Sequence, residues 1–136
     1  MERFNDANIF IRLIAWDDPA KGRACRALFD RVSSGRETLF TSEAVIAEVV
    51  FVLSSPRLYQ LTRREVVARL VPLLQLRGLR LVGKAIVLAA LQHYQESNLD
   101  FVDCLAVAHT RAEGLAAIYN YDKALDRIPG VLRQEP

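Results

Sequence analysis

Short segments that read as β-strands, the first of them rather polar, alternate along this chain with longer segments of helical periodicity. The strand-like segments span residues 2–5, 37–42, 79–82, 116–121 and 131–133. The helical segments span residues 8–15, 17–35, 43–55, 62–76, 84–97 and 97–114. Strands that are separated by helices pair in parallel, because the connection has to cross the sheet. The alternation therefore predicts an α/β fold, a three-layer sandwich in which a parallel sheet of four or five strands lies between helices.

Several helix starts carry the residues that favour them. Asp18 stands before a proline, and Ser42 precedes a long apolar segment, so both are expected to cap helices. Thr62 and Glu65 have the spacing of a capping box. Pro72 lies inside the same helical pattern and is expected to bend it.

Length and composition favour one domain with a real core. The chain has 136 residues, of which 51% are hydrophobic, and no repeat or linker divides it, so we expect a single domain over residues 1–136. No apolar run approaches the roughly 20 residues of a membrane span, and no secretory signal is visible, which predicts a cytoplasmic protein without a membrane partner. Cys25 and Cys104 could form one bridge, but buried free thiols are the expected state.

Four acidic residues fall where a parallel sheet presents the carboxyl ends of its strands. Asp6 follows the first strand and Asp122 follows the fourth. Glu48 lies in the second turn of the helix after the second strand, and Asp103 lies in the first turn of the helix before the fourth. Crossover helices run antiparallel to the strands, so all four are expected at one edge.

Carboxylates crowded at one edge repel each other, which raises their pKa values unless a cation is present. Mg²⁺ prefers such oxygen ligands, binds phosphate oxygens and activates water. The pattern predicts phosphoryl transfer or phosphodiester hydrolysis. Asp100 shares a helix face with Asp103, and the favourable charge at a helix start explains Asp100 well. It explains Asp103 less well, because Asp103 lies beside the apolar stripe.

Five motifs in order resemble a known family. They are "NDANIFIRLI", "DDPAKGRACRALFDRV", "SEAVIAEVVFVL", "LDFVDCLAVAHTRAEG" and "IYNYDKALDRIPGV". The sequence resembles the PIN-domain ribonucleases, in particular the VapC-type toxins of toxin–antitoxin pairs. The resemblance implies a PIN-like fold, an RNA endonuclease that depends on Mg²⁺ or Mn²⁺, and a homodimer bound to an antitoxin protein.

The resemblance also assigns roles to individual residues. It implies that Asp6, Glu48, Asp103 and Asp122 are the catalytic acids, with Asp6 and Asp103 as metal ligands. The supporting residues are expected to be Asn8, Asp100 and Asn120, and Asn120 stands where the family usually has a threonine. An asparagine there can still orient a water.

An acidic edge needs basic neighbours if it is to bind RNA. The candidates near the predicted edge are Arg12, Arg111, Lys123 and Arg127. The alternative for each is a solvated surface charge. Tyr121 could stack on a base, but a packing role is favoured, and His93 and His109 have no Cys or His partner at ligand spacing.

Two other functions compete with the ribonuclease. A phosphatase of the aspartyl-phosphate kind would need a second acid two residues after its nucleophile, and Asn8 occupies that position. A PIN-like domain without catalysis, used as a binding module, is the other alternative. The intact set of four acids argues against it.

Overall fold

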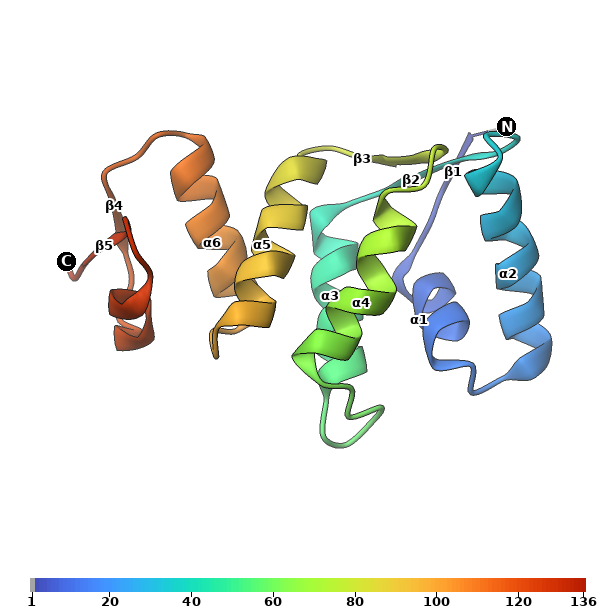
Figure 1. Ribbon diagram of the computed structural model, residues 1–136, viewed down its shortest axis with the longest axis horizontal. Coiled ribbons are helices and arrows are strands. Elements are labelled where there is room, and N and C mark those ends of the chain that lie inside the picture. Colours follow the sequence, from blue (N-terminus) through green and yellow to red (C-terminus); the bar gives the residue numbers. More distant parts are fainter. Residues whose placement is uncertain (1) are drawn as a thin grey trace. The chain divides into compact units, whose positions relative to one another are not determined.

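The computed structural model describes residues 2–136, which divide after Lys84 into two compact units (Figure 1). The N-terminal unit contains β1 (Glu2–Phe4), α1 (Ala7–Ala15), α2 (Pro19–Ser33), β2 (Thr38–Thr41), α3 (Glu43–Ser54), α4 (Arg63–Leu74) and β3 (Leu79–Leu81). The C-terminal unit, Ala85–Pro136, contains nearly all of α5 (Lys84–Glu96), then α6 (Phe101–Ala112), β4 (Ala117–Tyr119), the 3-10 helix η1 (Lys123–Arg127) and β5 (Leu132–Gln134). The predicted α/β class is confirmed.

The sheet of the N-terminal unit is parallel, in the order β1-β2-β3. Leu39 in β2 is paired with Arg3 on one side and Leu79 on the other. Leu39 and Leu79 are 2% and 0% exposed, so the middle of this sheet is part of the core. Helix α1 packs against α2, α3 and α4, and its Phe10 ring lies 5.6 Å from the ring of Phe29 in α2.

The predicted helix caps are present. The Asp18 carboxylate accepts a hydrogen bond from Lys21 N at 3.2 Å, and Ser42 Oγ accepts one from Val45 N at 3.3 Å. Thr62 Oγ1 accepts from Glu65 N at 3.1 Å. Each bond satisfies a backbone donor that the first helical turn leaves unpaired. Pro72 lies inside α4, which continues to Leu74.

A close backbone approach precedes β3. A Cβ atom on Gly78 would lie 2.2 Å from Glu37 O and 2.8 Å from Val32 O. Gly78 N donates to Val32 O at 3.0 Å, and Leu39 N donates to Gly78 O at 2.9 Å. These contacts tie the end of α2, the start of β2 and the start of β3 together, and they leave no room for a side chain.

In the C-terminal unit β4 and β5 pair in parallel, with Ile118 opposite Arg133, and α6 packs on β4. Tyr94 of α5 and Phe101 of α6 make an edge-to-face ring contact at 5.9 Å. Leu125 of η1 is fully buried and anchors the segment that follows β4. The core of this unit therefore joins its helices to the η1 segment.

Most sequence predictions of the elements are confirmed, with shifted ends. The last long helix begins at Phe101, with Asp100 at its N-cap and Asp103 in its first turn, as predicted. Within residues 2–136 the five parallel strands pair as two sheets, β1-β2-β3 and β4-β5. Cys25 and Cys104 are buried free thiols, as predicted. The packing role expected for Tyr121 is not observed, because its side chain is 71% exposed.

None of the helices described in residues 2–136 is long and apolar enough to cross a membrane.

Candidate functional site

Asp6 lies at the carboxyl end of β1, where it caps α1. Its Oδ1 accepts a hydrogen bond from Ala7 N at 2.7 Å, and its side chain is otherwise exposed. The preceding residue, Asn5, is fixed by two bonds to β2: Asn5 N donates to Phe40 O at 2.6 Å, and Thr41 Oγ1 donates to Asn5 O at 3.0 Å. The ends of β1 and β2 thus hold Asp6 in place, as predicted for an acid at a strand's carboxyl end.

The other predicted acid of the N-terminal unit, Glu48, is exposed on α3, a helix that packs against α1. Its neighbours Val49 and Val50 are buried, so the backbone of this turn is held by the core. Asn8 is exposed in the first turn of α1. Asp6, Asn8 and Glu48 therefore belong to one unit and stand on two helices that contact each other.

In the C-terminal unit an asparagine joins two predicted acids. Asn120 follows β4, and its Nδ2 donates to Asp103 Oδ1 at 3.3 Å. Its Oδ1 accepts from Asp122 N at 2.8 Å. Asp122 in turn caps η1 by accepting from Ala124 N at 2.9 Å. The amide of Asn120 thus connects the start of α6 with the end of β4, and it orients the Asp103 carboxylate.

Sequence reasoning missed Arg133, which supports this connection from β5. Arg133 Nη1 donates to Asn120 O at 3.0 Å and to Glu135 Oε1 at 3.1 Å, while Nε donates to Asp126 Oδ1 at 2.9 Å. Its side chain is only 11% exposed. The hydrogen bond from Arg133 lowers the pKa of the Asp126 carboxyl. A charged residue inside a short strand was the only sequence signal for this role.

Asp100 occupies the N-cap position of α6, but its side chain makes no capping hydrogen bond. The partial positive charge of the helix N-terminus still favours an acidic side chain at this position. The sequence argument predicted a cap, and the position is confirmed without the bond.

The predicted basic residues differ in how they are engaged. Arg12 binds Asp17, with Nη1 at 3.0 Å and 2.9 Å from the two carboxylate oxygens. Tyr59 Oη donates to the same carboxylate at 2.6 Å, and these two partners lower the pKa of Asp17. The guanidinium of Arg12 is therefore committed to the connection between α1 and the α3–α4 loop. Lys123 is exposed at the start of η1.

The donor set suits a hard divalent cation. Asp6, Glu48, Asp103 and Asp122 offer carboxylate oxygens, which are the ligands that Mg²⁺ and Mn²⁺ prefer. Within the part of the chain that the structure describes, no group of three or more His, Cys, Asp or Glu side chains is found at metal-binding spacing. What the structure brings together is the Asp103–Asn120–Asp122 connection, in one unit.

The sequence model of the PIN domain matches residues 4–131 of this chain. The chain therefore belongs to the PIN-domain family, as its motifs predicted. The match covers both units and includes Asp6, Glu48, Asp103 and Asp122. No individual curated protein matches the sequence.

Two solved structures are similar to this chain. One is the VapBC2 complex from Rickettsia felis bound to a DNA fragment from its promoter, with 17% identity, a TM-score of 0.38, and coverage of 99% of this chain and 98% of that chain. The other is VapC20 from Mycobacterium tuberculosis, a toxin that cleaves the sarcin–ricin loop, with 21% identity, a TM-score of 0.39, and coverage of 90% of each chain.

Proposed function

We propose that this protein is a metal-dependent endoribonuclease and the toxin of a toxin–antitoxin pair. The observation that carries the proposal is the family match over residues 4–131 in a chain that keeps all four acids. The sequence motifs that resemble VapC-type toxins support the more specific assignment. We further propose that the two units act as one domain, because the family match spans both.

In this proposal Asp6, Glu48 and Asp103 would hold a Mg²⁺ or Mn²⁺ ion, directly or through water, and Asp122 would hold an ordered water or a second ion. Such an ion polarises a phosphate and lowers the pKa of a bound water. Asn120 orients the Asp103 carboxylate through the bond at 3.3 Å, and Asn8 supports Asp6. The expected products carry 5′-phosphate and 3′-hydroxyl ends.

The proposed partners are RNA, a second copy of the chain and an antitoxin protein. They follow from the motifs shared with VapC-type toxins. An antitoxin would inhibit the enzyme by placing a basic side chain among the acids.

The deciding experiment is cleavage of a panel of structured and single-stranded RNAs with Mg²⁺, Mn²⁺ or EDTA. The proposal predicts cleavage with either metal, none with EDTA, and 5′-phosphate ends on the products. Absence of cleavage on every RNA, together with absence of Mg²⁺ binding in calorimetry, would instead favour a binding module without catalysis.

A further inference from the structure

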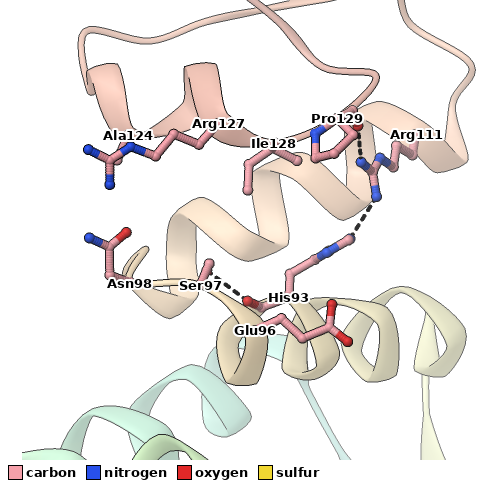
Figure 2. Close-up of a pocket in the computed structure, with 9 residues that line it drawn as sticks. All are labelled: His93, Glu96, Ser97, Asn98, Arg111, Ala124, Arg127, Ile128 and Pro129. Carbon is pink, nitrogen blue, oxygen red and sulfur yellow. Dashed lines mark hydrogen bonds between the residues drawn. The ribbon is translucent and has the colours of Figure 1, made fainter.

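The C-terminal unit contains a cavity of about 610 Å³ (Figure 2). The last turn of α5 and the turn after it form one wall. The end of α6, together with η1 and the residues after η1, forms the opposite side. A cavity of this size is within the range that small-molecule ligands occupy.

Arg111 lies at one end of the cavity and is oriented by neutral acceptors. Its Nη1 is 3.1 Å from His93 Nε2, and its Nη2 donates to Pro129 O. A guanidinium can only donate, so Nε2 of His93 is the acceptor of this bond. Burial, and then the charge of Arg111, lowers the pKa of His93. The guanidinium is fixed in place while its positive charge stays uncompensated by a carboxylate.

Arg127 lies toward the other end. Figure 2 shows Arg127 and Asn98 on opposite walls there, while Arg111 and His93 lie together at the far end. Arg127 is exposed, and no ion pair of its guanidinium is found in the part of the chain that the structure describes. The carboxylate in the lining, Glu96, accepts a hydrogen bond from Gln92 Nε2 at 3.2 Å. Two arginines and the single carboxylate of Glu96 thus leave the lining of this cavity with a net positive charge.

The cavity also offers groups suited to a base. Ile128 and Pro129 give it an apolar surface, and Asn98 contributes an amide to the lining. Guanidinium groups match phosphate oxygens in geometry, and an unpaired RNA base exposes both an apolar face and polar edges. A nucleotide of single-stranded RNA combines these features with the negative charge that the arginines require.

We propose that this cavity is a nucleotide-binding subsite in which Arg111 and Arg127, at its two ends, bind different backbone phosphates of a single RNA strand and Asn98 contacts a base. The inference rests on the proposed ribonuclease function and adds a second contact region to it. Asp103 and Arg111 lie on the same helix, and at 1.5 Å per residue they are about 12 Å apart along its axis. A strand bound near Asp103 would therefore reach the cavity within a few nucleotides.

The first test measures binding of a short fluorescent single-stranded RNA to the full chain in EDTA, where cleavage does not interfere. Arg127→Gln is expected to weaken binding about tenfold, as the loss of one charged hydrogen bond would. The slope of log K against log salt concentration should become less steep by about one, because one phosphate contact is lost. Arg23→Gln on α2, also an exposed arginine, is the matched control and should leave both values unchanged. Equal effects of the two variants would overturn the proposal.

The second test uses the two histidines of the chain as local probes. The RNA and a 5′-mononucleotide are expected to shift the imidazole signals of His93, which lines the cavity, more than those of His109. Arg127→Gln should abolish the shift. Inorganic phosphate alone should produce a weaker shift than the nucleotide. An unmoved His93 signal, or an equal response to inorganic phosphate or to an acidic peptide, would overturn the nucleotide assignment.

These outcomes separate the two proposals. If the protein cleaves RNA normally and Arg127→Gln leaves RNA binding unchanged, only the subsite proposal is contradicted. Binding at the cavity without any metal-dependent cleavage contradicts the ribonuclease and leaves the subsite as an RNA-binding feature.

Discussion

Arg12 and the arginine partners of Glu37 in the N-terminal unit are engaged differently from Arg111 in the C-terminal unit. In the N-terminal unit Glu37 is 8% exposed and binds Arg3 Nη1 at 3.0 Å and Arg31 Nε at 2.9 Å. Arg12 is likewise paired with a carboxylate, that of Asp17. In the C-terminal unit Arg111 donates to an imidazole and a carbonyl, so its charge is left available.

This difference separates structural charges from charges that can bind a ligand. An arginine paired with a carboxylate joins two segments of chain and offers little net field to an anion. An arginine held by neutral acceptors is oriented without being neutralised. Even within the C-terminal unit Arg133 is of the first kind, because Asp126 and Glu135 pair with it while it supports Asn120. We therefore expect substitutions in the two classes to affect different measurements.

The largest expected effect is on catalysis. Asp103→Asn should lower the rate of RNA cleavage by roughly 100-fold or more. Mutating a residue that only supports a metal ligand already lowers metal affinity or activity about 10–100-fold. The fold should persist, since an amide oxygen can still accept from Asn120 Nδ2. Cleavage rates with Mg²⁺ and a thermal melt measure the two quantities. Asp30→Asn, an exposed aspartate on α2 that pairs with Arg26 at 3.9 Å, is the control. Wild-type cleavage by the Asp103 variant would contradict the assignment.

The next effect is on stability in the N-terminal unit. Gly78→Ala should lower the free energy of unfolding by about 3 kcal/mol, because the new Cβ would meet backbone oxygens that cannot move aside easily. Urea unfolding followed by the fluorescence of Trp16, the single tryptophan, measures it. Gly114→Ala is the comparison. Nothing lies within 4 Å of a Cβ added at Gly114, so the only cost is the strain of a side chain at a φ of +66°, about 1 kcal/mol. A smaller loss at Gly78 than at Gly114 would be inconsistent with the packing described.

A third prediction concerns the support of Asp103. Asn120→Ala removes the amide that joins Asp103 and Asp122, and cleavage should fall about 10-fold while the affinity for Mg²⁺ weakens. Asn120→Thr, the residue that the resemblance places here, keeps a hydroxyl and should recover much of the loss. Calorimetric Mg²⁺ binding distinguishes a positioning role from a general loss of structure. Unchanged metal affinity in Asn120→Ala would remove Asn120 from the site.

The smallest effect tests the structural ion pairs through pH. Arg31, and then Arg3, lower the pKa of Glu37 in the folded state below its value in the unfolded chain. The carboxylate therefore stabilises the fold above the unfolded pKa of about 4.3, and this contribution is lost as the pH falls through the lower folded pKa. The difference in urea midpoint between wild type and Glu37→Gln should be constant near neutral pH and shrink under acid conditions. A difference that grows with acidity would reverse the sign assigned here.

Much of the fold could be predicted because its signals are local. The caps at Asp18, Ser42 and Thr62 act on backbone groups only three residues away, so sequence spacing is enough to identify them. The positions of Asp6 and Asp122 directly after strands follow from the same local reasoning. The roles of Arg12 and Tyr121 were harder to predict, because they depend on which groups packing brings near them.

The sequence alone determined the order of helices and strands and the family to which the chain belongs. Tertiary structure alone decided that Gly78 has no room for a side chain, that Arg133 supports Asn120, and that Arg12 is neutralised while Arg111 is not. The physical reason is the range of the interactions. Periodicity and capping depend on neighbours within a turn, whereas hydrogen bonds between Asn120 and Asp103, or between Arg111 and His93, join residues 17 and 18 positions apart and exist only once the chain is packed.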